Sequence, residues 1–216
     1  MSDHFEGEEK SSGYTRRSFL KSAGTVAATG VVAQNALAGT TEAAKTKPRV
    51  ARLAGDIDVK LNVNGVTQTV SCEPRTTLLS ALRHKLSPAQ TGTKLVCDHG
   101  TCGACTVLVD EEPVCSCMTL AVDMKGKEIR TVEGLANGDE LSIVQAAFVE
   151  HDALMCGFCT PGFVMSVTGC LEKNPGASLP EIKSACAGNL CRCGTYPHIF
   201  DAAIAAGQRM KKGGTK

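Results

Sequence analysis

A glycine-containing loop with three closely spaced cysteines constrains this chain more than any other part of its sequence. The loop has a C-x4-C-x2-C spacing and a fourth cysteine follows after eleven residues: Cys97, Cys102, Cys105 and Cys117. A loop around a metal centre must bring backbone N–H groups against sulfur, and Gly100 and Gly103 allow positive φ without steric cost. This spacing is typical of four thiolates that hold a plant-type [2Fe–2S] cluster.

A second set of cysteines lies further along the chain, as a C-x2-C pair and a later C-x-C pair. Its members are Cys156, Cys159, Cys191 and Cys193. We predict that both sets are metal ligands, and therefore that the chain holds two [2Fe–2S] clusters. The other four cysteines lie in apolar-periodic segments and are expected to be buried small hydrophobes: Cys72, Cys115, Cys170 and Cys186.

Length and composition narrow the class of protein. The chain has 216 residues, which suggests one large or two small domains with real cores. It has no Trp, two Tyr and six Phe, which argues against stacking surfaces for nucleic acid or carbohydrate. The formal net charge is only +1, so a basic face for nucleic acid is not predicted.

The amino terminus has the pattern of an export signal. Arg16-Arg17 precede a mildly apolar run that ends in the A-x-A pattern Ala36-Leu37-Ala38. We interpret residues 1–38 as a twin-arginine signal peptide and residues 39–56 as a flexible leader, and we expect a periplasmic protein. The apolar run is short and rich in Ala, Gly and Thr, so no membrane span is expected.

The export route bears on the alternatives to iron–sulfur clusters. Twin-arginine export moves folded proteins, so clusters can be assembled in the reducing cytoplasm, and a disulfide scaffold would not need this route. Zinc sites favour paired C-x2-C knuckles. The first set has one such pair inside a longer loop and the second closes with C-x-C, so zinc is the weaker interpretation.

Residues 57–135 have the pattern of a small α+β domain. Alternating apolar residues predict a strand from Ile57 to Val63, and Asn64-Gly65 predicts a tight hairpin turn into a partner strand. A helix is expected from Leu78, with Thr76 or Thr77 as its N-cap. After the cysteine loop come short strands over 106–109, 114–117 and 128–132. This order fits a β-grasp ferredoxin-like domain.

One ligand of the first set is ambiguous in this reading. Cys115 and Cys117 would project to the same side of the predicted 114–117 strand. Either could therefore be the fourth ligand.

Residues 140–210 have helical periodicity throughout. Apolar faces predict four helices. The second begins at Pro161 with Thr160 as its N-cap, the third at the capping box Ser178–Glu181 and the fourth at Pro197. Both cysteine pairs of the second set lie just ahead of a predicted helix start. Exposed N–H groups and the positive end of a helix stabilise an anionic thiolate centre. We therefore expect an all-α four-helix domain with the second cluster between the Thr160 and Pro197 helix starts.

These motifs resemble the iron–sulfur subunits of the molybdenum hydroxylases, the xanthine dehydrogenase and aldehyde oxidoreductase family. The resemblance covers residues 57–207 and is closest to the periplasmic aldehyde oxidoreductase and isoquinoline oxidoreductase small subunits. It also assigns Cys117 as the fourth ligand of the first set. It implies that a large partner subunit carries molybdopterin and hydroxylates the substrate, an aldehyde or an N-heterocycle. Electrons would then pass through the helical-domain cluster and the β-grasp cluster to an FAD subunit or a cytochrome.

The resemblance also implies roles for two residues beside the second cluster. Cys193 would contact the pterin as well as ligate iron. Met155 stands where the family often has a Gln that contacts the pterin. The resemblance therefore does not carry this polar contact over to the present chain. The alternative function is a free-standing periplasmic electron carrier, but a simple ferredoxin needs only the β-grasp part. The chain itself is therefore predicted to be a non-catalytic subunit of an oxidoreductase.

Overall fold

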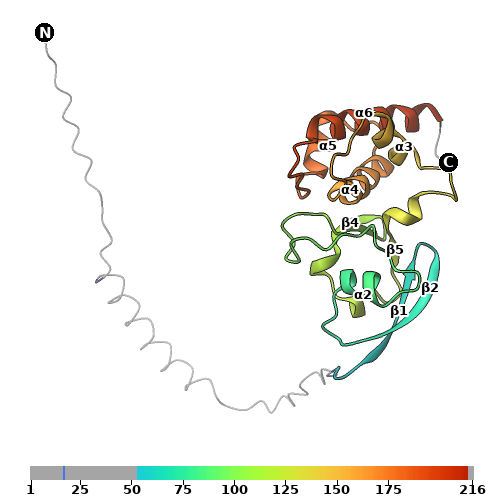
Figure 1. Cartoon of the computed structure of the whole chain (residues 1–216), viewed down its shortest axis with the longest axis vertical. Coiled ribbons are helices and arrows are strands. Elements are labelled where there is room, and N and C mark those ends of the chain that lie inside the picture. Colours follow the sequence, from blue (N-terminus) through green and yellow to red (C-terminus); the bar gives the residue numbers. More distant parts are fainter. Residues whose placement is uncertain (1–16, 18–52, 214–216) are drawn as a thin grey trace, which may run out of the picture. The chain divides into compact units, whose positions relative to one another are not determined.

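The computed structural model describes residues 53–213 and Arg17 (Figure 1). Apart from Arg17, the predicted signal peptide over 1–38 lies outside the described residues, as does most of the predicted leader over 39–56. Residues 53–213 belong to one compact unit. Its first half carries a five-stranded sheet and its second half carries helices, so the α+β class predicted from the sequence is confirmed.

The first hairpin forms as predicted. Strands β1 (Ile57–Val63) and β2 (Val66–Cys72) pair antiparallel, with Val63 opposite Val66. Asn64 and Gly65 join them with φ of 51° and 78°, the positive values that a two-residue hairpin turn needs. The inward side chains of both strands, including Leu61 and Val70, are buried.

The sheet has the strand order β2-β1-β5-β3-β4. Its other strands are β3 (Thr106–Val109), β4 (Glu112–Cys115) and β5 (Glu128–Arg130). β5 pairs parallel with β1 and antiparallel with β3, which places it in the middle of the sheet. Helix α2 (Leu78–His84) covers the sheet with Leu78, Ala81 and Leu82, and Thr77 caps it by accepting from the Ser80 N–H at 3.2 Å.

Two predicted strand ends are wrong. β4 ends at Cys115, and Ser116–Met118 form the 3₁₀ turn η1 because the Ser116 hydroxyl and N–H both donate to the Cys105 carbonyl. Cys115 and Cys117 therefore do not share one strand face. β5 ends at Arg130, and the chain turns into the 3₁₀ segment η3 (Val132–Leu135). A further 3₁₀ turn, η2, spans Ala121–Met124.

The second half contains the helices α3 (Ile143–Glu150), α4 (Thr160–Lys173), α5 (Leu179–Ala185) and α6 (Tyr196–Gly213). Their buried core includes Phe148, Phe163, Leu171, Ile182 and Ile199. α5 begins with the predicted capping box, in which the Ser178 N–H donates to Glu181 at 2.7 Å. α4 and α6 each begin one residue before the predicted position. No helix in the described part of the chain is long and apolar enough to span a membrane.

Contacts between α4 and the sheet determine how the two cysteine sets lie relative to each other. Helix α4 packs against β3, and its Gly169 lies close to the side chain of Leu108. Arg130 of β5 forms a two-pronged ion pair with Glu172 of α4, of which the Nη1–Oε1 distance is 2.9 Å. The first turn of α4 lies beside the loop that precedes β3, because its Gly162 lies against the Gly103 carbonyl.

Candidate metal centres

The first cysteine set lies between α2 and β3 and is completed by η1. Cys102, Cys105 and Cys117 are buried, and Cys97 is partly exposed. The pKa of Cys97 and that of Cys102 each respond to the other thiol, and the pKa of Cys117 responds to the neighbouring thiol of Cys105. The structure thus brings the four predicted residues together as two thiol pairs.

Backbone N–H groups of the loop point at these sulfurs. Chiefly because the His99 N–H donates to it, the pKa of Cys97 is lowered to about 5. Burial raises the pKa of the Cys117 thiol to about 12, and the backbone N–H of Gly100 acts against that rise. Asp98, Gly100 and Gly103 all have positive φ, which turns the loop inward. Sequence reasoning identified the two glycines and missed Asp98, for which only the tolerance of Asp for this conformation is a signal.

Cys115 lies close to the same pairs. Burial raises its pKa, and it also contacts the side chain of Cys105. It is partly exposed and, with Leu79, Cys105 and Cys117, packs in a small apolar cluster. Cys117 differs from it in receiving a backbone N–H from the loop, which is the feature expected of a metal-bound thiolate.

The second cysteine set forms around the starts of α4 and α6. Cys159 is the N-cap residue of α4, and its side chain hydrogen-bonds that of Cys191. Cys193 lies beside Cys156, whose backbone N–H and thiol act on the pKa of Cys193 in opposite directions. Two more thiol pairs are therefore present where the sequence places them, one partly or fully buried and the other exposed.

Thr195 stabilises the anionic form of one buried sulfur. Burial tends to raise the pKa of Cys191, but its hydrogen bond with the Thr195 hydroxyl and the one it accepts from the Thr195 N–H outweigh burial and lower the pKa to about 7. The Thr195 N–H lies 3.4 Å from the Cys191 sulfur. This N–H comes directly before α6, so the expected use of a helix start as a thiolate donor is observed here.

The donor chemistry fits [2Fe–2S] clusters. In the part of the chain that the structure describes, no group of three or more His, Cys, Asp or Glu side chains is arranged to hold one metal ion. The thiols instead form two pairs in each set. A [2Fe–2S] cluster takes two cysteines on each iron, so each set offers a matching complement of donors. The twelve cysteines, all of which lie in the described part of the chain, form no disulfide bond.

Direct contacts join the two cysteine loops, which sequence reasoning did not predict. The Leu190 N–H donates to the Cys102 carbonyl at 2.9 Å, and the Asn189 amide donates to the Gly103 carbonyl at 2.9 Å. Gly162, in the first turn of α4, lies against the same Gly103 carbonyl. The residue before Cys191 therefore touches a residue of the first set directly.

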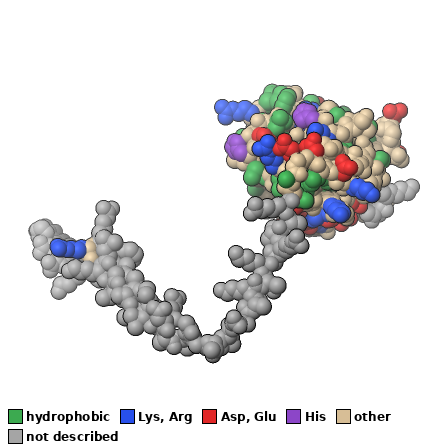
Figure 2. Space-filling view, turned by 90° about the horizontal axis from the view of Figure 1, so that it is seen from below, with side chains coloured by type: hydrophobic (Ala, Val, Ile, Leu, Met, Phe, Trp, Pro, Cys, Tyr) green, Lys and Arg blue, Asp and Glu red, His purple; other side chains and the backbone are tan. Residues whose placement is uncertain are grey.

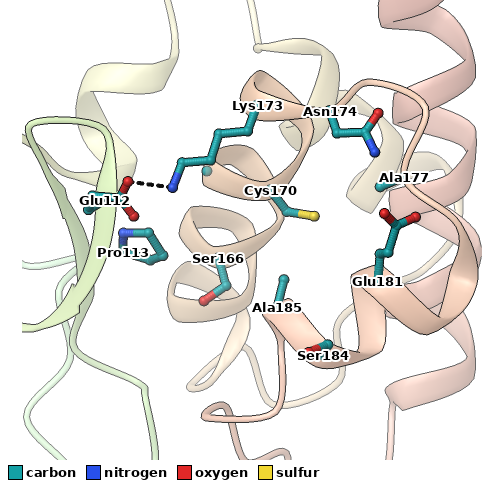
Figure 3. Close-up of a pocket in the computed structure, with 11 residues that line it drawn as sticks. Glu112, Pro113, Ser166, Cys170, Lys173, Asn174, Ala177, Glu181, Ser184 and Ala185 are labelled. Carbon is teal, nitrogen blue, oxygen red and sulfur yellow. Dashed lines mark hydrogen bonds and ion pairs between the residues drawn. The ribbon is translucent and has the colours of Figure 1, made fainter.

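The four remaining cysteines only partly match their predicted burial. Cys72 and Cys186 are buried in the two cores. Cys115 and Cys170 are partly exposed. Cys170 faces a groove of about 420 Å³ between β4, α4 and α5, whose rim carries the Lys173–Glu112 ion pair (Figure 3). None of the eight predicted ligands lines this groove.

Charged side chains of both signs are interspersed on the face shown in Figure 2.

Large apolar side chains are exposed near the second set: Leu154, Met155, Phe158 and Leu190. Met155 is 72% exposed, and its neighbour Cys156 is also exposed. The exposed thiol pair thus lies among apolar side chains that residues 53–213 leave exposed.

Two sequence families match this chain. The family described as "2Fe-2S iron-sulfur cluster binding domain" matches residues 61–136, and the one described as "[2Fe-2S] binding domain" matches residues 131–204. Each match contains one of the two cysteine sets.

Whole-chain relatives extend this similarity. The nicotine 6-hydroxylase small subunit of Paenarthrobacter nicotinovorans is 48% identical over 73% of this chain and 94% of its own length. The aldehyde oxidoreductase iron-sulfur-binding subunit PaoA of Escherichia coli O157:H7 is 41% identical over 91% of this chain and 90% of its own. The crystal structure of quinoline 2-oxidoreductase from Pseudomonas putida 86 matches with a TM-score of 0.69 and 40% identity, over 74% of this chain and 99% of that chain. The chain therefore belongs to the iron–sulfur subunits of the molybdenum hydroxylases, which are non-catalytic subunits of oxidoreductases.

Proposed function

We propose that this chain carries electrons through two [2Fe–2S] clusters in a periplasmic molybdenum hydroxylase that oxidises an aldehyde or an N-heterocycle. The observation that carries the proposal is the pair of thiol sets joined through Cys102 and Leu190. The chain covers 90% or more of the relatives compared above, whose names are those of oxidoreductase subunits.

Each half of the chain supplies one set of ligands in this proposal. Residues 57–135 would act as a β-grasp domain and residues 140–210 as a four-helix domain. The first would bind iron through Cys97, Cys102, Cys105 and Cys117, and the second through Cys156, Cys159, Cys191 and Cys193. When bound, the clusters supply one-electron oxidation and reduction. The chain's own contribution is to orient the thiolates, to donate N–H groups to sulfur and to keep water from the buried pairs.

A large molybdopterin subunit is the proposed partner at the second set. Support comes from the exposure of Cys156 and Cys193 and from the apolar side chains beside them, including Met155 and Phe158. Cys193 would contact the pterin, and Met155 would offer an apolar contact where the family often has Gln. The first set would face the acceptor, an FAD subunit or a cytochrome.

A free-standing electron carrier is not favoured. The two sequence relatives compared above are named as subunits of a hydroxylase and of an oxidoreductase. A free-standing carrier would also give no reason for Cys156 and Cys193 to lie exposed among apolar side chains, as a docked partner would.

Metal analysis tests the cluster content. Anaerobically purified full-length protein is expected to contain about four irons and four acid-labile sulfides per chain. After reduction, low-temperature EPR is expected to show two distinguishable two-iron signals. Zinc without sulfide would contradict the proposal and would make the chain a structural metal protein.

Export is tested separately through the arginine pair. We propose that residues 1–38 direct the folded chain to the periplasm, on the strength of Arg16-Arg17 and the Ala36–Ala38 pattern. Replacing both arginines by lysine keeps the charge and is expected to leave the protein in the cytoplasmic fraction with its iron content unchanged. A Lys21→Arg variant is the matched control and is expected to reach the periplasm. Periplasmic recovery of the double variant would contradict twin-arginine export.

A further inference from the structure

Asn189 is a buried polar residue at the junction of the two cysteine loops. Its side chain is 7% exposed and makes three hydrogen bonds. The Nδ2 group donates to the Gly103 carbonyl at 2.9 Å and to the Thr106 hydroxyl at 3.3 Å, while Oδ1 accepts from the Ser166 hydroxyl at 2.7 Å. One carboxamide thus ties the first cysteine loop, β3 and α4 together.

The backbone beside Asn189 carries the direct link between the sets. Leu190 donates its N–H to the carbonyl of Cys102, and Leu190 is bonded to Cys191. A route of covalent bonds and one hydrogen bond therefore runs from a ligand of the second set to a ligand of the first. The hydrogen bond from Asn189 to Gly103 is next to this one along both segments. Asn189 comes directly before Leu190, and Gly103 comes directly after Cys102.

We propose that Asn189 is a positioning residue for electron transfer between the two centres. Its carboxamide fixes the Gly103 carbonyl and so keeps the Cys102 carbonyl within reach of the Leu190 N–H. With clusters bound at both sets, one electron would pass from the second set to the first, so the former centre would be oxidised and the latter reduced. No covalent bond forms or breaks, and no proton needs to move. This inference rests on the proposed two-cluster function.

Two substitutions separate positioning from mere stability. Asn189→Asp keeps an oxygen for Ser166 but has no N–H for Gly103, and it sets a carboxylate against that carbonyl. Ser166→Ala removes the bond on the other side of the carboxamide and leaves both Nδ2 contacts in place. Each variant loses buried hydrogen bonding, but only the first loosens the contact between the loops.

The experiment uses the full-length, iron-loaded chain and two readouts other than turnover. Hydrogen exchange is expected to be about tenfold faster at the Leu190 amide in Asn189→Asp than in the parent chain. The magnetic interaction between the two reduced centres, seen by EPR, is expected to weaken in the same variant. Ser166→Ala is expected to match the parent in both, and Asn189→Gln, which keeps a carboxamide, to recover part of the loss.

Each remaining outcome has a definite meaning. If the parent chain shows no pair of two-iron signals, the proposed function itself is overturned. If the parent shows them and Asn189→Asp leaves both exchange and magnetic interaction unchanged, only the role of Asn189 is overturned. Should Asn189→Asp lose iron, Asn189→Ala removes the carboxamide without adding charge and is measured in its place. Iron loss in both variants would assign Asn189 to assembly of the centres and overturn the positioning role.

Discussion

Cys117→Ala is expected to remove the cluster of the first set, whereas Cys115→Ala is expected to retain it. Both thiols contact Cys105, but only the Cys117 sulfur receives the Gly100 N–H. Iron should fall from about four to about two per chain in Cys117→Ala, and one of the two EPR signals should disappear. The second set shares no ligand with the first, so its signal should persist.

Cys115→Ala is the matched control because it removes a neighbouring thiol from the same apolar cluster. It is expected to retain about four irons per chain and both signals, with only a small loss of thermal stability. If iron were lost in Cys115→Ala and kept in Cys117→Ala, Cys115 would be the fourth ligand.

Local patterns in the sequence predicted most of the elements. Asn64-Gly65 predicted the hairpin because few residue pairs accept two positive φ values in succession. The threonine pair Thr76-Thr77, of which Thr77 is the cap, and the Ser178–Glu181 capping box predicted helix starts. Each cap replaces a missing backbone hydrogen bond with a side chain four residues or fewer away. The cysteine spacings predicted which thiols come together, since a metal centre limits how far apart its ligands can lie.

Features that depend on distant residues were not predictable in this way. The 3₁₀ turn that carries Cys117 forms because Ser116 bonds to Cys105, eleven residues earlier in the chain. The bond between Asn189 and Gly103 joins residues 86 positions apart. No local pattern encodes either contact, so the sequence could place each cysteine set but not the junction between them.

Gly162→Ala is expected to lower the free energy of unfolding by about 1 to 3 kcal/mol. Replacing a glycine in a helix by alanine usually raises it instead. A Cβ at this position would lie 2.3 Å from the Gly103 carbonyl oxygen. That oxygen cannot turn away readily, because it accepts from the Thr106 N–H, the Thr106 hydroxyl and the Asn189 amide. The added methyl must therefore push the start of α4 away from the first cysteine loop. The midpoint for thermal loss of the iron–sulfur absorbance should fall by about 4 to 10 °C.

Gly169→Ala tests whether the obstacle at Gly162 is the fixed carbonyl. Gly169 lies on the same helix, and a Cβ there would meet the end of the Leu108 side chain at 2.9 Å. The end of a side chain can shift, whereas a carbonyl that accepts three hydrogen bonds cannot. The gain in helix propensity also offsets part of the crowding. Gly169→Ala should therefore change the midpoint by no more than about 3 °C. Equal losses in the two variants would mean that any methyl on this helix is tolerated poorly. An unchanged midpoint in Gly162→Ala would mean that the two cysteine loops are not held in close contact.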